Sequence, residues 1–367
     1  MRLKKRKKKL LERNYFHKNL FINRLNPRVT SKKKENYRKI IVIKIMLLLF
    51  LFTLYYFLFT SYYKTLKITS KNESIFIVCR FGTHILKSNH RILKYFYALN
   101  NFIPKSKVVL AVSEYTIIEP NLTQFQNLTI NIEKYGNETF EDIRRKYGFS
   151  NFYFNALRYS FYYYYLQNHP EIKYVVVSDE DTLFIRDPLL LIAENPNIVH
   201  IMEDVFPFSR IIDGNYIWTN AWANLNNFTK KRCGLKFLNK SLLSKEIKDL
   251  IPLNCGTMLG SSKNLIKIFK LMSIKFKCVG MFPNNAEQGL LNYLDLSGEL
   301  KELGFPIHRH NIYNGSLLSC PGLLPIQNYT QQINSKHIIA VHHYHLLKSN
   351  YIKNSPYFFK KIMNIRF

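Results

Sequence analysis

Three carboxylates stand together directly after an apolar, β-branched run in this sequence. Tyr174–Val177 reads as a buried strand, and Ser178 is followed by Asp179, Glu180 and Asp181. Ligand sites of open α/β sheets lie at the carboxyl ends of their strands. If the backbone bends after the strand, Asp179 and Asp181 can turn toward one point. Two such hard oxygen ligands suit Mn²⁺ or Mg²⁺.

A solvated acidic turn that caps the sheet and binds nothing is the simpler interpretation of the same residues. The chain is poor in acids, with 24 Asp and Glu among 367 residues, and three of these acids fall at the exit of one strand. That concentration favours a metal site. A divalent ion held there would neutralise a diphosphate and stabilise it as a leaving group.

The segments around this acidic cluster read as an alternation of strands and helices. The expected strands are Ile75–Cys79, Val108–Val112, Leu128–Ile132, Tyr174–Val177, Asn197–Met202, Asn254–Leu259 and Ile338–Val341. The expected helices are His84–Leu99, Thr139–Tyr147, Asn151–Gln167, Ser262–Met272 and Asn285–Leu294. This order predicts an α/β sheet with right-handed crossovers, carried by one catalytic domain.

Four short motifs, spread over residues 156–348, occur in the order found in one enzyme family. They are Arg158 on a helix before Asp179-Glu180-Asp181, then Asn254-Cys255-Gly256, then Glu287-Gln288-Gly289-Leu290-Leu291-Asn292, then the run from His342 to Lys348. Together they resemble the metal-dependent, nucleotide-sugar glycosyltransferases of the GT-A fold, and their layout is closest to the glycogenin-like group. The resemblance implies a Rossmann-like mixed sheet flanked by helices.

The resemblance also implies a role for each motif. The metal ligands would be Asp179, Asp181 and His342. The donor-binding residues would be Arg158, Asp179, Glu180, Asp181, Asn254, Gly256 and Lys348. Glu287 and Gln288 would be the catalytic residues that orient the transferred sugar or the acceptor. His342 has the best spacing to Lys348, while His343 and His345 remain alternative ligands. Retention of anomeric configuration would follow from the same resemblance.

Each of these residues is also consistent with an ordinary structural role. Arg158 could pair with a carboxylate of the acidic turn, and Glu287 could complement a helix dipole. Asn254 and Gly256 could belong to a buried strand with one turn residue. Three further candidate residues follow the Asn197–Met202 strand, in a region where an acceptor could dock. They are Asp204, Trp218 and Trp222. Core packing is the commoner use of a tryptophan.

The N-terminal part of the chain predicts a membrane anchor. Residues 1–39 hold 16 Lys and Arg against two Glu, a net charge of +14 out of +30 for the whole chain. Residues 40–63 are almost entirely apolar and long enough to span a bilayer as a helix. The positive-inside rule places residues 1–39 in the cytosol as a basic tail. We therefore expect a short stem at 64–73 and a lumenal catalytic domain at 74–367.

Sequons and cysteines agree with a secretory lumen. All Asn-x-Ser/Thr sequons follow the apolar segment, at Asn72, Asn121, Asn127, Asn137, Asn227, Asn239, Asn314 and Asn328. Their one-sided distribution fits a glycosylated lumenal domain. The five cysteines allow at most two disulfides, and their pairing cannot be read from the sequence. A Golgi membrane is the expected location, with the endoplasmic reticulum as the alternative.

The sequence thus predicts a single-pass type II glycosyltransferase that transfers a hexose from a UDP- or GDP-linked donor to a glycan or glycoprotein acceptor. Its first rival is a catalytically silent lumenal glycan-binding or scaffold protein on the same fold. A glycosidase with paired carboxylates is a second rival, and it predicts metal-independent hydrolysis. A nucleic-acid-binding protein is the third. Nearly half of the net charge lies beside the apolar segment, where basic residues set topology, so we expect no nucleic-acid partner.

Overall fold

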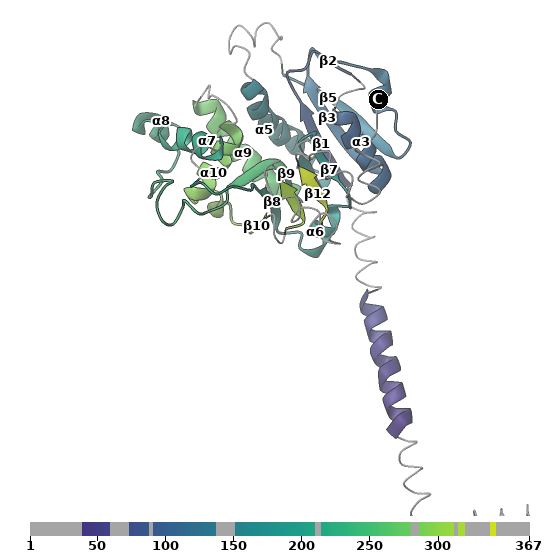
Figure 1. Ribbon diagram of the computed structural model, residues 1–367. Helices are drawn as coiled ribbons and strands as arrows, with labels where there is room; N and C mark the ends of the chain where they lie inside the picture. The colour runs from purple at the N-terminus through teal and green to yellow at the C-terminus, as the bar shows by residue number, and fades with distance from the viewer. Residues whose placement is uncertain are drawn as a thin grey trace, which may run out of the picture. The chain divides into compact units, whose positions relative to one another are not determined.

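The computed structural model describes residues 39–58, 73–87, 91–136, 151–209, 214–279, 286–311, 315–319 and 338–342. The chain divides into two compact units, Met1–Leu66 and Lys67–Phe367. In the first unit, Lys39–Leu58 is a helix of 20 residues with a mean hydropathy of 2.5 (Figure 1). It is long and apolar enough to cross a membrane. The last five residues of the predicted span, 59–63, lie outside the described residues.

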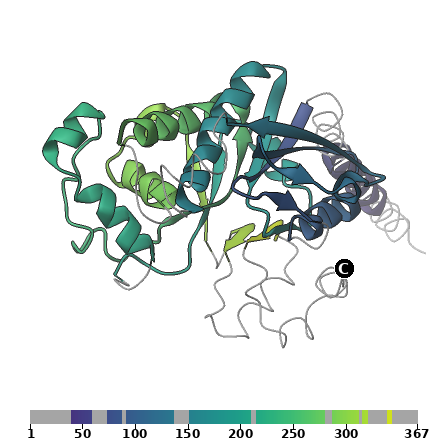
Figure 2. The ribbon, with the colours of Figure 1, turned by 90° about the horizontal axis from the view of Figure 1, so that it is seen from above.

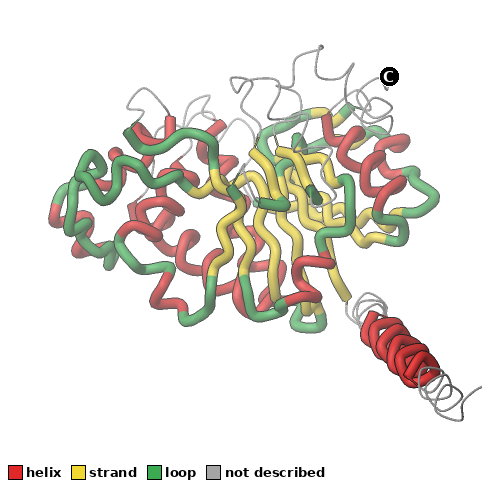
Figure 3. Tube along the Cα trace, turned by 60° about the horizontal axis from the view of Figure 1, so that its bottom comes forward, coloured by secondary structure: helices red, strands yellow, loops and turns green. Residues whose placement is uncertain are grey.

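A seven-stranded sheet forms the centre of the second unit, with the strand order β10-β8-β9-β6-β1-β3-β5. The strands are β1 (Glu73–Arg80), β3 (Ser106–Ser113), β5 (Leu128–Tyr135), β6 (Ile172–Ser178), β8 (Val199–Glu203), β9 (Leu253–Ser261) and β10 (Ile307–His310). Every neighbouring pair is parallel except the two pairs made by β9. Figure 3 shows these strands side by side in the middle of the unit. The predicted mixed α/β architecture is confirmed.

Helices cover both faces of this sheet. They are α3 (Arg91–Phe102), α5 (Asn151–Asn168), α6 (Leu189–Glu194), α7 (Gly214–Ala223), α8 (Asn227–Arg232), α9 (Ser262–Val279) and α10 (Ala286–Leu296), with short 3₁₀ turns at Pro120–Thr123 and Lys301–Leu303. Alternate residues of β1 show why two layers form. Ile75 and Ile77 pack with residues of α5, α9 and α10, whereas Phe76 and Val78 pack with α3 and α6. A strand buried on both faces reads as a continuous apolar run.

Helices α5 and α9 pack on each other through aromatic and aliphatic side chains. In α9 the buried residues Leu265, Ile268, Phe269 and Met272 recur at the spacing of one helix face. The ring of Phe269 lies 5.0 Å, centroid to centroid, from that of Tyr162 on α5. This contact holds the amino-terminal half of α5, which carries a predicted site residue, against the sheet.

A second, three-stranded sheet has the order β11-β12-β7. Its strands are β7 (Thr182–Phe184), β11 (Leu317–Ser319) and β12 (Ala340–His342). β12 runs antiparallel to β7 and places His342 opposite Thr182. In Figure 2 the yellow-green C-terminal strands lie between the green helices and the blue strands. This small sheet therefore brings the end of the described chain to the residue that follows the acidic cluster.

Two of the expected helices have different bounds from those predicted. The stretch His84–Leu99 is not one helix, because Ile85–Leu86 forms strand β2, which pairs with β4 (Ile117–Ile118). α3 begins only at Arg91. The Thr116 hydroxyl donates to the carbonyl of Thr83, so a contact with a distant segment overrides the local helical pattern. α9 extends to Val279, and the predicted helix Thr139–Tyr147 lies outside the described residues.

One disulfide lies within the described part of the chain. Cys233, which follows α8, is bonded to Cys278 in the last turn of α9, with 5.5 Å between their Cα atoms. Cys79 and Cys255 are free thiols. The described sequon asparagines are all exposed: Asn121, Asn127, Asn227 and Asn239. Both features are consistent with an oxidising, glycosylating compartment.

Replacing Cys233 and Cys278 together by serine is expected to lower the free energy of unfolding by about 4 kcal/mol, because the bond closes a long loop in the unfolded chain. The sequence separation is 45 residues. Urea unfolding of the wild type and the double variant, each with and without reductant, measures the loss. Reductant should destabilise the wild type to the level of the variant and leave the variant unchanged. Equal stability of wild type and variant without reductant would contradict the assignment.

Candidate functional site

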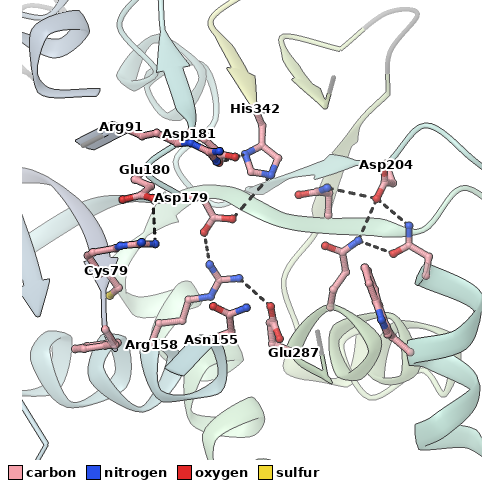
Figure 4. Close-up of a pocket in the computed structure, with 16 residues that line it drawn as sticks. Cys79, Arg91, Asn155, Arg158, Asp179, Glu180, Asp181, Asp204, Glu287 and His342 are labelled. Atoms are coloured by element: carbon pink, nitrogen blue, oxygen red, sulfur yellow. Dashed lines mark hydrogen bonds and ion pairs between the residues drawn. The ribbon is translucent and has the colours of Figure 1, made fainter. Parts of the chain in front are cut away.

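A cavity of about 350 Å³ lies at the edge of the main sheet where its parallel strands end. The ends of β1, β6 and β8 contribute Arg80, Asp179 and Asp204 respectively. β9 runs in the opposite direction, so it is its beginning, at Asn254, that reaches the same edge. Figure 4 shows Cys79 and Asp204 on opposite sides of the cavity, with Asp179 between them. Polar groups from strands that lie far apart in the sequence therefore converge on one space.

Asp179, Asp181 and His342 form a group that could hold a metal ion. One ligand atom from each lies within 4.8 Å of the others. His342 Nδ1 is 3.2 Å from Asp181 Oδ1, and His342 Nε2 is 3.8 Å from Asp179 Oδ2. Two carboxylates and an imidazole are a donor set that borderline and hard divalent ions accept. The predicted cluster of two aspartates and His342 is therefore present in the structure.

The position of His342 is set by the small sheet. Its pairing with Thr182 places the imidazole beside the acidic turn, and the Thr182 hydroxyl oxygen lies 3.1 Å from Nδ1. His342 is only 1% exposed. A hydrogen bond to one ring nitrogen fixes the orientation of a ligating histidine. Thr182 therefore orients the ring so that Nε2 is directed toward Asp179.

Gly256 makes room for this ring. A Cβ atom added at Gly256 would lie 2.2 Å from His342 Nε2 and 2.4 Å from both adjacent carbons. The pairing of β8 with β9 shifts between Ile201 and Met202, so residues 255–257 leave the ladder with β8 as a bulge. The Gly256 carbonyl also accepts a hydrogen bond from the Asp179 backbone N–H at 2.9 Å. The glycine of the Asn-Cys-Gly motif is thus required by the histidine.

Arg158 lies between two carboxylates on the floor of the site. Its guanidinium contacts Asp179 and also lies 3.5 Å from Glu287 Oε1. Burial alone would favour the neutral form, but the two carboxylates hold the pKa of Arg158 well above its ordinary value. Burial raises the pKa of Glu287, and the charge of Arg158 opposes that rise. The chain from Asp179 through Arg158 to Glu287 couples the metal group to the first turn of α10 (Figure 4).

Replacing Arg158 by methionine is expected to destabilise the metal-free protein by about 3–5 kcal/mol at pH 8, because it leaves the buried Glu287 carboxylate without its partner. The pKa of Glu287 would then rise further above its ordinary value of 4.5. An acid with a higher pKa in the folded state binds more protons when folded, so stability falls as the pH rises above about 4.5.

Urea unfolding in chelator at pH 5 and pH 8 tests this prediction. The variant should lose more stability at pH 8 than at pH 5. Arg158→Lys keeps the positive charge and serves as the matched control, with a smaller loss and a weaker pH dependence. An equal loss for Arg158→Met at both pH values would show that Glu287 is not the group that the arginine compensates.

Asp204 is the centre of a second polar group, on the side of the cavity away from Cys79 (Figure 4). Its Oδ2 accepts hydrogen bonds from the side-chain amides of Asn215, Gln288 and Asn254, at 2.8, 3.0 and 3.4 Å. Its Oδ1 accepts from the backbone N–H of Val205. These amides come from α7, α10 and β9. The carboxylate therefore joins three separate elements around one end of the cavity.

The structure divides the predicted site residues into three sets. Those that line the cavity are Arg158, Asp179, Glu180, Asp181, Asn254, Glu287, Gln288 and His342. Gly256 lies behind the His342 ring. Glu180 forms an ion pair with Arg80 at 3.1 Å and is not part of the metal group. Lys348, His343 and His345 lie outside the described residues.

Several lining residues were not predicted from the sequence. They are Cys79, Arg80, Phe81, Arg91, Asn155 and Asn215. Arg80 could have been predicted, because it directly follows the expected strand Ile75–Cys79. The acidic cluster likewise follows the strand Tyr174–Val177, so both lie at strand ends. Asn155 lies three residues before Arg158 and so shares its helix face. Asn215 carries no signal of its own, because only the packing of α7 on α10 brings it to the cavity.

Comparison with known proteins adds no family to this site. No protein-family model matches the chain, and no curated protein is significantly similar to it in sequence. The chemistry of the site therefore follows from its own residues. These are a carboxylate and imidazole group that could hold a metal ion, at the edge of a mixed α/β sheet, beside a buried arginine and a polar cluster around Asp204.

Proposed function

We propose that this protein is a membrane-anchored glycosyltransferase that transfers a hexose from a UDP- or GDP-linked donor to a glycan or glycoprotein acceptor. The observation that carries the proposal is that the group Asp179, Asp181 and His342 and the polar groups of Asp204, Glu287 and Gln288 line one cavity. One end suits a metal-bound diphosphate, and the other suits a ring with several hydroxyl groups. A nucleotide sugar has these two parts joined by one bond.

The diphosphate end is supported by the choice of ligand atoms. Mn²⁺ or Mg²⁺ held by Asp179, Asp181 and His342 would supply Lewis-acid stabilisation to a departing diphosphate. Arg158 keeps a positive charge below this group, and its contacts with Asp179 and Glu287 hold both carboxylates in place. By the resemblance to GT-A enzymes, Lys348, which lies outside the described residues, would be a further cation for the phosphates. The metal ion, Arg158 and Lys348 would together stabilise the negative charge that develops on a departing diphosphate at this end.

The sugar end is supported by Glu287 and Gln288. Glu287 is 4% exposed yet lines the cavity, and its Oε2 has no hydrogen-bond partner among the described residues. A buried acceptor of this kind is costly unless a ligand's hydroxyl completes it. Gln288 lines the same wall and donates to Asp204. Both side chains are therefore suited to orient a sugar, which is the role proposed for them as catalytic residues.

The first unit supports a place in the secretory pathway. Lys39–Leu58 can span a bilayer, and the 16 basic residues among the first 39 favour a cytosolic N-terminus. The catalytic unit would then lie in the lumen, where the Cys233–Cys278 disulfide and the exposed sequons belong. We propose a Golgi membrane and a type II orientation on these grounds.

Binding and hydrolysis of nucleotide sugars by the full-length, detergent-solubilised chain test the proposal. A panel of UDP- and GDP-linked hexoses would be offered with Mn²⁺, with Mg²⁺ and with chelator. The expected result is metal-dependent binding and slow hydrolysis of one donor, which also names the sugar. Failure of every donor to bind a folded, metal-loaded protein would overturn the assignment and favour a silent glycan-binding protein.

A further inference from the structure

The two tryptophans of this chain lie one helical turn apart on α7 and have different environments. Trp222 is completely buried and packs edge-on against Phe276, with ring centroids 5.6 Å apart. Trp218 is only partly buried and lines the cavity. This large aromatic side chain lies at the wall of a mostly polar cavity and belongs to none of the core clusters among the described residues. The position of Trp218 therefore needs another explanation.

Trp218 packs against two glycines from different elements, one beside its indole and one beside its backbone. A Cβ atom added at Gly214, the first residue of α7, would lie 2.3 to 2.8 Å from three atoms of the indole. A Cβ atom added at Gly289, on α10, would lie 2.6 Å from the Trp218 carbonyl. The contact with backbone atoms requires glycine at position 289, and a side chain at position 214 would displace the indole from its present position. The two glycines thus allow Trp218 to occupy this position between α7 and α10 at the cavity.

The residues near Trp218 are carboxylates and amides. Asn215 lies on the same helix as Trp218 and donates to Asp204, and Gln288 precedes the glycine that packs on the Trp218 backbone. Asp204 and Glu287 are the acids of this region. The charge of Arg158 is shared between Glu287 and Asp179, so it does not neutralise Asp204. The wall that carries Trp218 therefore combines an aromatic ring with the carboxylate of Asp204, whose side-chain partners among the described residues are uncharged amides.

We propose that Trp218 is the stacking platform for an uncharged pyranose and the residue that, with Asp204, selects neutral sugars against uronic acids. The C–H face of a pyranose packs on an indole, while its hydroxyls donate to carboxylate oxygens. A sugar carboxylate would meet the charge of Asp204 without a compensating cation among the described residues. The stacking of a neutral sugar on Trp218 does not depend on the proposed function. Only the identity of that sugar, as the donor or the acceptor, rests on it.

Intrinsic fluorescence reports directly on this site, because the chain has only two tryptophans. Trp218→Phe leaves the buried Trp222 as the sole emitter, and the wild-type spectrum minus that of this variant isolates Trp218. The probes for the full-length chain are UDP, UDP-glucose, UDP-galactose, GDP-mannose and UDP-glucuronic acid. Free methyl glucoside and methyl glucuronoside, each with UDP and Mn²⁺ present, test the acceptor.

A neutral sugar should shift the Trp218 emission, and its glucuronate counterpart should bind about tenfold more weakly. A shift with a nucleotide hexose but not with UDP places the donor ring on Trp218. A shift of the Trp218 emission that occurs only when methyl glucoside is added to UDP and Mn²⁺ places the acceptor ring on Trp218. Trp218→Ala should raise the KM or Kd for that sugar about tenfold, with Trp218→Phe intermediate, since a smaller ring retains part of the stacking.

The outcomes separate this inference from the proposed function. If nucleotide sugars bind with metal but none of the neutral sugars perturbs Trp218, the platform is wrong and the glycosyltransferase assignment stands. If no nucleotide sugar binds but a neutral glycoside shifts the Trp218 emission, the platform stands and the enzyme assignment falls. Equal binding of glucuronate and neutral sugar would overturn the selection by charge. Because Trp218 is partly exposed, Trp218→Phe should fold, and the unchanged Trp222 emission checks this.

Discussion

Replacing Asp181 by asparagine is expected to lower the affinity for Mn²⁺ at least about 100-fold and to reduce donor hydrolysis about 10³-fold, because the variant loses a ligand and its charge. Asp181 is 8% exposed, lies 3.2 Å from His342 Nδ1 and is one of the two carboxylates of the metal group. Asparagine has nearly the same shape. The fold should therefore survive while the metal site fails.

Calorimetric titration of Mn²⁺ into chelator-treated, full-length protein measures the affinity, and donor hydrolysis measures the activity. Asp249→Asn is the matched control, since it removes the same charge from an exposed position that does not line the cavity. Its affinity and activity should equal those of the wild type. Undiminished Mn²⁺ binding in Asp181→Asn would mean that the metal group is not a metal site.

Replacing Gly256 by alanine is expected to damage the metal site as severely as removing His342. The new methyl group would lie 2.2 Å from His342 Nε2, and the ring is held at Nδ1 by Asp181 at 3.2 Å and Thr182 at 3.1 Å, so it cannot move aside without losing these contacts. Either the imidazole leaves its position beside Asp179 or strand β9 moves. Overpacking of this kind costs about 1–3 kcal/mol in stability. Metal affinity should fall with it.

A double-mutant cycle with His342→Ala separates the steric cause from any other effect of the methyl group. Gly256→Ala should be destabilising in the wild type and nearly neutral when the imidazole is absent, because the two side chains compete for one space. Urea unfolding of the four proteins gives the interaction energy, and Mn²⁺ titration follows the site. A cost for Gly256→Ala that is the same in both backgrounds would contradict this steric explanation of the glycine.

The elements of the main sheet could be predicted from the sequence because their signal is local. Val175, Val176 and Val177 are buried on both faces, so they form an uninterrupted β-branched run. Six of the seven expected strands correspond to strands of the main sheet, with shifts at their ends. The seventh, Ile338–Val341, corresponds to β12 of the small sheet, and β10 was not predicted. The position of Asp179 and Asp181 was predictable for the same reason, since a cluster of acids after a buried strand must lie at the edge of the sheet.

The third member of the metal group, His342, was harder to predict from the sequence. The resemblance to GT-A enzymes pointed to His342, with His343 and His345 as alternatives. What brings His342 to Asp181 is the pairing of β12 with β7, between residues about 160 positions apart. No local pattern encodes such a pairing, because its energy comes from contacts that exist only in the folded chain. The disulfide between Cys233 and Cys278 likewise depends on contacts between distant segments, so its pairing could not be predicted from the sequence.

The structure also changed the explanation of residues that the sequence had singled out. Gly256 was expected among the donor-binding residues, and the structure adds that its missing side chain makes room for the His342 ring. Trp218 and Trp222 were indistinguishable in the sequence, and the packing of α7 buries one and leaves the other at the cavity. In each case the decisive neighbour comes from a distant segment.

By itself, the sequence determined the apolar N-terminal helix, the alternation of strands and helices, and the place where the carboxylates leave the sheet. These follow from hydrophobic periodicity and charge, which act over a few residues. Only the tertiary structure decided that His342 joins the two aspartates, that Arg158 is shared between Asp179 and Glu287, and that Trp218 faces the cavity. These depend on which strand ends and helix faces meet, and long-range packing alone sets that.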